Sequence, residues 1–223
     1  QRIEKIAKSG DKDARAELPL LERIIEGLGE AKPVRAQGLE EEELEMIKEL
    51  TLLTAKPSLY VANISEDDLT NKVENDYVKK VREFAASHDS EVVTFSAKVE
   101  AELIEIEDEE ERQMFIDELG ITEPSLNRLI RGGFKLLGLI TYFTAGEKEV
   151  RAWTIKQGTN AQKSAGEIHT DIEKGFIRAE VVAYEKFIEY NGWQGAKEKG
   201  AMRLEGKEYV VNDGDVMYFR FNV

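Results

Sequence analysis

Two short polar segments contain the side chains in this sequence that are best suited to chemistry. Asn63 and Glu66 follow the apolar run 59–62, and Ser96-Ala97-Lys98 follows the run 91–95. The side-chain amide of Asn63 can both donate and accept hydrogen bonds, so it suits an adenine edge, which has a donor at N6 and an acceptor at N7. The two segments therefore predict a ligand site, provided that the fold brings them together.

Both apolar runs have the length and composition of buried strands, and the stretch between them has helical spacing. The spacing predicts a helix over 75–87 with Tyr77, Val81 and Phe84 directed inward. A strand, a helix and a second strand form a βαβ unit with parallel strands. Ligands sit at the carboxyl ends of such strands, so we expect the two polar segments to lie side by side at a ligand site.

This arrangement resembles the base-recognition end of a P-loop GTPase, in which an Asn-Lys-x-Asp loop and a Ser-Ala-Lys loop hold the purine. The first loop departs from that pattern, since it reads Asn63-Ile64-Ser65-Glu66. Ile64 replaces the lysine of that pattern and Glu66 replaces its aspartate, and an unmatched buried polar group at such a site costs about 1–3 kcal/mol. An Asn-x-x-Glu loop in this context resembles the Obg-like ATPase family, also called YchF, whose members prefer ATP to GTP.

The resemblance implies a function for the parent protein and a role for each loop residue. The parent would bind ATP with Mg²⁺, hydrolyse it slowly and associate with the ribosome. Asn63 would read the adenine edge, Ile64 would pack on the ring, and Ser96 and Ala97 would supply the backbone of the second loop. Glu66 completes the set of base-binding residues that the resemblance implies.

The phosphate-binding motif Gly-x-x-x-x-Gly-Lys-Ser/Thr does not occur in the 223 residues. The backbone amides and lysine of that loop, a Ser or Thr that binds Mg²⁺, and a residue that positions water together supply nearly all the catalysis of phosphoryl transfer. We therefore assign no catalytic residue in this chain, expect no tightly bound cofactor, and predict that the chain alone does not hydrolyse ATP. Glu66-Asp67-Asp68 is interpreted as a solvated or helix-capping run, and no metal site is predicted.

Composition narrows the classes of protein. The chain has a formal net charge of −14 and no cysteine, which excludes disulfides and thiolate metal sites. No apolar run reaches membrane-spanning length and no signal peptide is visible, so a cytoplasmic protein without a membrane partner is expected. Residues 1–139 hold 19 Lys and Arg against 32 Asp and Glu, and this acid excess disfavours DNA or a broad RNA surface.

Residues 1–55 show helical spacing at Ile3 and Ile6, and again from Leu18 to Leu28 and from Leu39 to Leu50. We expect a helical hairpin of two antiparallel helices, with a kink or restart at Pro19. The acidic run 40–43 is interpreted as the solvated first turn of the second helix, with an acidic docking surface as the alternative.

The last third of the chain changes to strand-like runs over 140–144 and 150–155, a short helix over 161–168, and further strands over 176–182 and 216–223. This order is typical of a ubiquitin-like β-grasp fold. The segments 142–146, 150–154 and 168–180 resemble the signature of a TGS domain. We therefore predict an α/β and α+β multidomain chain: a helical hairpin over 1–55, the C-terminal part of a P-loop NTPase sheet with flanking helices over 56–139, and a TGS domain over 140–223.

Two alternatives to an ATPase remain open. The chain could be a non-catalytic adaptor that binds the ribosome, RNA or a protein through the hairpin and the TGS domain, or an acidic scaffold. A local RNA or ribosome face is predicted at Lys156, Lys163, Lys174 and Arg178. His169 is expected to end a helix and hydrogen-bond the following turn rather than act as an acid or base with Asp171.

Overall fold

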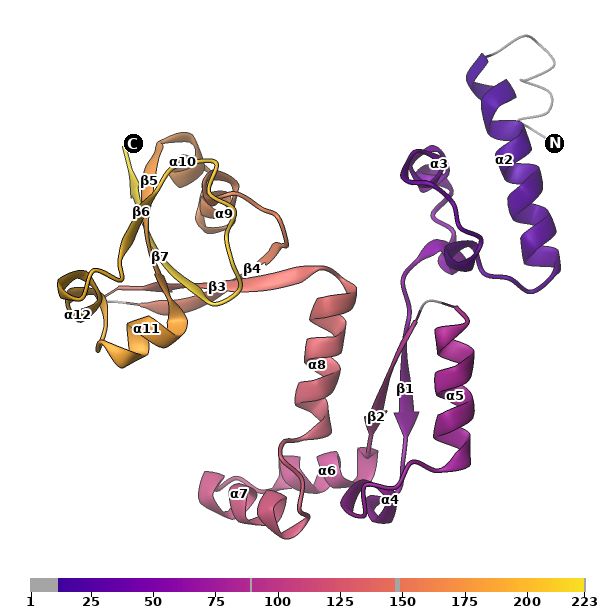
Figure 1. The fold of residues 1–223 in the computed structure, drawn as a ribbon, viewed down its shortest axis with the longest axis horizontal. Helices are drawn as coiled ribbons and strands as arrows, with labels where there is room; N and C mark the ends of the chain where they lie inside the picture. Colours follow the sequence, from indigo (N-terminus) through magenta and orange to yellow (C-terminus); the bar gives the residue numbers. More distant parts are fainter. Residues whose placement is uncertain (1–11, 89, 147–148, 223) are drawn as a thin grey trace. The chain divides into compact units, whose positions relative to one another are not determined.

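The computed structural model describes residues 12–88, 90–146 and 149–222, and the chain divides into two compact units, residues 1–133 and 134–223. The boundary falls within one helix. Among the described residues, no helix has both the length and the apolar composition needed to cross a membrane. The two units are described in turn (Figure 1).

The first unit combines helices with a two-stranded sheet. Strands β1 and β2 run parallel, with Asn63 opposite Phe95 at their carboxyl ends. Helix α5 packs on both strands and connects them, so the predicted βαβ unit is present. The elements are α2 (Lys12–Gly29), α3 (Glu41–Met46), β1 (Leu59–Asn63), α4 (Glu66–Thr70), α5 (Asp76–Ala86), β2 (Glu91–Phe95), α6 (Ala97–Glu105), α7 (Glu109–Glu118) and α8 (Ser125–Leu136).

The predicted hairpin differs from the structure in two ways. Helix α2 continues through Pro19 without the restart that was one of the two predicted possibilities. The second helix is only α3, six residues long, and short 3-10 turns follow it at Lys48–Leu50 and Leu53–Ala55. The chain leaves the helix because Ile47 is buried with Leu20, Ile24 and Val34, and Thr51 then takes a left-handed backbone conformation. The predictions at Ile3 and Ile6 lie outside the described residues.

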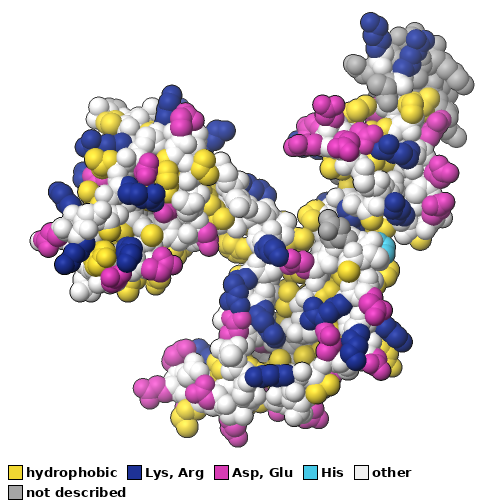
Figure 2. Space-filling view, in the orientation of Figure 1, with side chains coloured by type: hydrophobic (Ala, Val, Ile, Leu, Met, Phe, Trp, Pro, Cys, Tyr) yellow, Lys and Arg dark blue, Asp and Glu magenta, His cyan; other side chains and the backbone are white. Residues whose placement is uncertain are grey.

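The acidic run at α3 forms a capping box, in which Glu40 and Glu43 bond each other's backbone N–H groups. Acidic side chains gather over α3 in the space-filling view (Figure 2). Arg23 of α2 bonds Glu43 at 2.7 Å. These contacts agree with the interpretation of a solvated first helical turn.

The inward-facing residues predicted for 75–87 are partly wrong. Tyr77 is 81% exposed and Phe84 is 52% exposed, whereas Val78 and Ala85 are the buried residues of α5. Phe84 instead stacks on His88, which bonds the Phe84 carbonyl oxygen through Nδ1 at 2.8 Å. Helical spacing identifies an apolar stripe, but the sheet beneath determines which part of the stripe is covered, and two strands cover little of it.

The second unit is built on a five-stranded sheet of order β4-β3-β7-β5-β6, in which only β3 and β7 pair in parallel. Helices α9 and α10 lie over one face, and α11 and α12 lie on the other side (Figure 1). The elements are β3 (Leu139–Ala145), β4 (Val150–Lys156), α9 (Ala161–Ile168), α10 (Thr170–Lys174), β5 (Phe176–Ala183), α11 (Tyr184–Glu189), α12 (Trp193–Glu198), β6 (Arg203–Glu205) and β7 (Asp215–Phe221).

The core of the second unit lies between this sheet and α9. Tyr142 and Met217 are fully buried there, together with Ala161 and Ala165 of α9. The Tyr142 hydroxyl donates to the Ser164 carbonyl oxygen at 2.8 Å, which satisfies the one polar atom of its side chain. Helix α12 and strand β6 were not predicted, because each is very short and lacks a clear periodic pattern.

Candidate functional site

The carboxyl ends of β1 and β2 place the two polar loops next to each other. Asn63 is the last residue of β1, and Ile64 donates its backbone N–H to the Phe95 carbonyl oxygen at 2.8 Å. Ser96 follows Phe95 directly and precedes the first residue of α6. The predicted side-by-side arrangement of the loops is therefore present.

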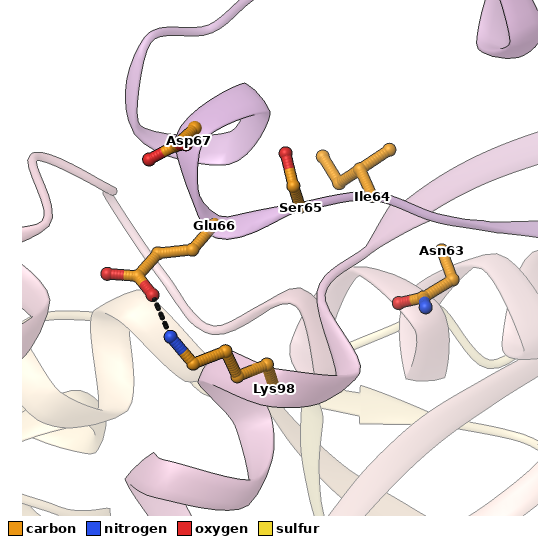
Figure 3. A pocket seen from close by; sticks show the side chains of 6 residues that line it. All are labelled: Asn63, Ile64, Ser65, Glu66, Asp67 and Lys98. Carbon is orange, nitrogen blue, oxygen red and sulfur yellow. Dashed lines mark hydrogen bonds and ion pairs between the residues drawn. The ribbon is translucent and has the colours of Figure 1, made fainter.

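Asn63 joins the two loops directly. Its Oδ1 accepts a hydrogen bond from the backbone N–H of Ala97 at 3.0 Å. The Nδ2 of Asn63 has no partner among the described residues. The side chain lies at the edge of the pocket in Figure 3. The amide thus keeps a donor without a partner in the described part of the chain, while its acceptor holds the second loop.

Glu66 and Lys98 form a second connection between the loops. Lys98 Nζ lies 2.6 Å from Glu66 Oε2 and 3.7 Å from a carboxylate oxygen of Glu102 (Figure 3). Hydrogen bonding to Glu66, together with the negative charges of Glu66 and Glu102, raises the pKa of the Lys98 ammonium. Lys98 is therefore fully charged at neutral pH, and the pair is ionic.

The acidic residues after Ile64 form the first turn of α4. Ser65 is the N-cap, and its Oγ accepts from the backbone N–H of Asp68 at 3.1 Å. Glu66, Asp67 and Asp68 then lie at the positive end of the helix dipole. This agrees with the capping interpretation, and among the described residues no group of three or more His, Cys, Asp or Glu is arranged to hold a metal ion.

These residues surround an open pocket of about 450 Å³. Of the five predicted base-binding residues, Asn63, Ile64 and Glu66 line it. Ser96 is fully buried, with its Oγ unpartnered among the described residues, and Ala97 acts through its backbone N–H. The assignment of base contacts to these residues stays a prediction. The full lining is Asn63, Ile64, Ser65, Glu66, Asp67 and Lys98.

The predicted site lacked three residues of the pocket, Ser65, Asp67 and Lys98, and of these Lys98 joins the two loops. The sequence places it third in Ser96-Ala97-Lys98, but the helical position of a side chain does not show how far its ammonium group reaches. The available signal for this ion pair was a lysine predicted to lie beside a loop with three acidic residues. The flexible four-carbon side chain of lysine allows its ammonium group to reach a carboxylate on a neighbouring loop.

The four predicted basic residues of the second unit are all exposed, but the sheet separates them. Lys163 lies on α9 and Lys174 ends α10, which packs against α9. Arg178 precedes Ala179, whose side chain faces α9, so Arg178 points from the opposite face. Lys156 donates to the Leu137 carbonyl oxygen at 2.8 Å. A single basic face formed by all four is not present.

His169 ends α9 and hydrogen-bonds the turn that follows, as predicted, but that turn begins a further helix, α10, which was not predicted. Its Nδ1 accepts from the backbone N–H of Asp171 at 3.2 Å, so the imidazole caps the helix that follows.

Known proteins that resemble this chain include two that share one name, and a family model matches part of it. Residues 139–222 match the family model YchF-GTPase_C, described as a protein of unknown function (DUF933). The chain is 55% identical over 223 residues to the "Ribosome-binding ATPase YchF" of Haemophilus influenzae and 54% identical over 222 residues to that of Bacillus subtilis. Each alignment covers 100% of this chain and 60% of the relative, so the chain spans about three-fifths of their length.

A solved structure agrees with these matches. The Schizosaccharomyces pombe YchF GTPase superposes with a TM-score of 0.82 at 32% sequence identity, covering 98% of this chain and 60% of that one. The agreement extends over the helices and sheets of both units.

Proposed function

The chain belongs to the YchF family, and on this premise we propose that it supplies the purine-reading part of an ATP-hydrolysing protein that associates with the ribosome. The observation that carries the proposal is the joined pair of loops, in which Asn63 bonds Ala97 and Glu66 bonds Lys98 beside an open pocket. Loops buried in core packing would have favoured an adaptor without a nucleotide role.

The chemistry of the loops favours adenine over guanine. Asn63 Nδ2 is a free donor and suits N7, an acceptor that both purines share. Discrimination therefore depends on which base atom Glu66 meets: at position 6 adenine has an amino donor and guanine an oxygen acceptor, whereas the guanine donors lie at N1 and N2. Glu66 offers only acceptors when ionised, so it matches the amino group and opposes the oxygen.

Hydrolysis needs groups that this sequence lacks. The motif that binds the phosphates is absent from the 223 residues. The six residues that line the pocket include no glycine, so they do not form a phosphate-binding loop. ATP and Mg²⁺ would therefore be held mainly by residues of a longer polypeptide, and the chain by itself contributes only the base contacts. In this proposal residues 56–139 are the C-terminal part of a P-loop NTPase domain.

Nucleotide titration of the purified chain, followed by NMR, tests the proposal. Millimolar adenosine nucleotides should shift the amide resonances of Asn63 and Ala97 more than guanosine nucleotides do, without release of phosphate. Asn63→Asp keeps the acceptor for Ala97 but loses the donor, so it should weaken binding about tenfold. Turnover of ATP by the chain, or equal binding of guanosine nucleotides, would contradict the proposal.

A ribosome contact through the second unit is the second candidate. The second unit is proposed to be a TGS domain of the β-grasp type, because the segments 142–146, 150–154 and 168–180 resemble that signature and a five-stranded sheet packs on α9 around its own core. Lys163 and Lys174 lie on adjoining helices and are its best basic pair for ribosomal RNA or protein in the cytoplasm. Loss of ribosome co-sedimentation in a Lys163→Glu, Lys174→Glu variant, but not in Lys156→Glu, is the expected result.

A further inference from the structure

The ion pair between Lys98 and Glu66 connects two helix starts that are 32 residues apart in the sequence. Lys98 lies in the first turn of α6, and Glu66 is the first residue of α4. In Figure 3 the lysine stem runs along one side of the pocket and its ammonium group meets the carboxylate at the far end from Asn63. This pair therefore ties the Glu66 side chain of the first loop to the helix that follows the second loop.

The pair uses only part of the carboxylate. Lys98 contacts Oε2, and Glu66 Oε1 has no partner among the described residues. An ionised carboxylate has about four lone-pair sites, so the free oxygen can still accept a hydrogen bond from a ligand. Without the lysine, Glu66 would have the freedom of an exposed side chain and would lie beside Asp67 with no fixed direction.

We propose that Lys98 is a positioning residue that holds Glu66 with one oxygen free for an exocyclic 6-amino group, and that it thereby sets the preference of this site for 6-amino over 6-oxo purines. The inference rests on the proposed function of the pocket as a purine site. Lys98 itself makes no base-specific contact in this scheme. Its charge acts through Glu66.

Adenosine and inosine provide the sharpest probes. They differ only at position 6, which carries an amino group in adenosine and an oxygen in inosine, and in the proton on N1 of inosine. Neither has a phosphate, so the missing phosphate-binding motif does not affect the comparison. The 223-residue chain is titrated with each nucleoside at millimolar concentrations, and the Asn63 and Ala97 amide shifts give the two dissociation constants. Lys98→Met keeps the length and the apolar stem but removes the charge. It should lower the adenosine-to-inosine preference about two- to fivefold, the range expected for an exposed ion pair.

Three further variants separate positioning from folding. Lys98→Arg restores a cation at this position and should recover much of the preference. Glu102→Gln removes the other carboxylate near Lys98, at 3.7 Å, and should leave the preference unchanged. Glu66→Gln introduces a donor, so it should weaken adenosine and strengthen inosine binding. A common melting temperature for all four variants shows that the fold is intact.

The outcomes distinguish the inference from the function on which it rests. If neither nucleoside perturbs the wild-type Asn63 and Ala97 resonances, the pocket is not a purine site and both ideas fail. If the wild type prefers adenosine and Lys98→Met keeps the full preference, the function stands and the role of Lys98 is overturned. A fall in preference with Lys98→Met, recovered by Lys98→Arg, is the result that supports the inference.

Discussion

The two units bury their sheets to different degrees, and the less buried one contains the candidate site. In the second unit, five strands enclose a core in which Tyr142, Val181 and Met217 are fully buried. In the first unit, two parallel strands leave Val61 46% exposed. Parallel sheets are normally covered on both faces, and a two-stranded sheet is marginal alone. Within the described residues, the two loops are thus joined at the end of a sheet that is only partly covered.

Separate clusters support the first unit. Leu69, Val99 and Leu103 form one with Ile116 and Leu119 near the pocket, whereas Leu20, Ile24, Val34 and Ile47 form another under α2. The cluster near the pocket includes Ile64 at its margin, so the packing of α6 and α7 fixes the loop that carries Asn63. We therefore expect the stability of the site to follow that cluster rather than the sheet.

Truncation of one core side chain in each unit gives the largest expected effect. Leu103 is 4% exposed and Met217 is fully buried, so Leu103→Ala and Met217→Ala should each destabilise their own unit by about 2–5 kcal/mol. Both tryptophans of the chain, Trp153 and Trp193, belong to the second unit, so urea unfolding followed by tryptophan fluorescence reports on it selectively. Met217→Ala should shift that transition and Leu103→Ala should not.

The control lies next to Leu103 on the same helix. Ile104 is 72% exposed, so Ile104→Ala should have little effect on the stability of either unit. Equal shifts of the fluorescence transition by Leu103→Ala and Met217→Ala would show that the two units unfold together and would remove the basis of the comparison.

Alkaline pH should act on the second unit through Tyr142. Burial, together with the negative charge of Glu167, raises the pKa of the Tyr142 phenol well above its usual value. The folded unit therefore keeps the proton above pH ~10, where the unfolded chain loses it, so stability is fully present below that pH and falls above it by about 1.4 kcal/mol per pH unit. Denaturant midpoints measured across this range give the slope.

Tyr142→Phe isolates this contribution. The variant should be less stable than wild type at neutral pH by about 1 kcal/mol, because the bond to the Ser164 carbonyl oxygen is lost. The difference should shrink as the pH rises beyond the ordinary tyrosine pKa, because only the wild type has this phenol to titrate. Parallel pH profiles of the two proteins would contradict this assignment.

The fold was predictable from sequence where periodicity and position agree. The run 161–168 and the strands around 139–145 and 150–156 appear nearly as expected, since turn residues bound each of them. The second hairpin helix was predicted too long, because the pattern at Leu44, Ile47 and Leu50 fits a helix although tertiary packing of Ile47 ends it early. Local spacing does not include that competition.

The site was predictable in its backbone and less so in its side chains. The sequence predicted that Asn63 and Ala97 lie close together, because the carboxyl ends of neighbouring parallel strands lie at the same edge of a sheet. The direction of the long Lys98 side chain depends on which carboxylate it contacts. Glu102 is on the same helix, and the other loop carries Glu66 and Asp67. Only the three-dimensional arrangement selects among them.

Two matched helix caps give the smallest effect and test whether the units respond independently. Asn75 caps α5 by accepting from the Val78 N–H at 3.0 Å, and Asn160 caps α9 by accepting from the Lys163 N–H at 2.9 Å. Alanine at either position should cost about 1 kcal/mol, seen by circular dichroism for Asn75→Ala and by tryptophan fluorescence for Asn160→Ala.

Aspartate substitutions refine that test, because the surroundings of the two caps differ in charge. Asn160→Asp keeps an accepting oxygen and should restore stability. Asn75 also donates to Asp68 Oδ2 at 2.8 Å, so Asn75→Asp would place two carboxylates together and should stay destabilised. Full rescue at both positions would mean that the acidic α4 turn exerts no repulsion on a carboxylate at position 75.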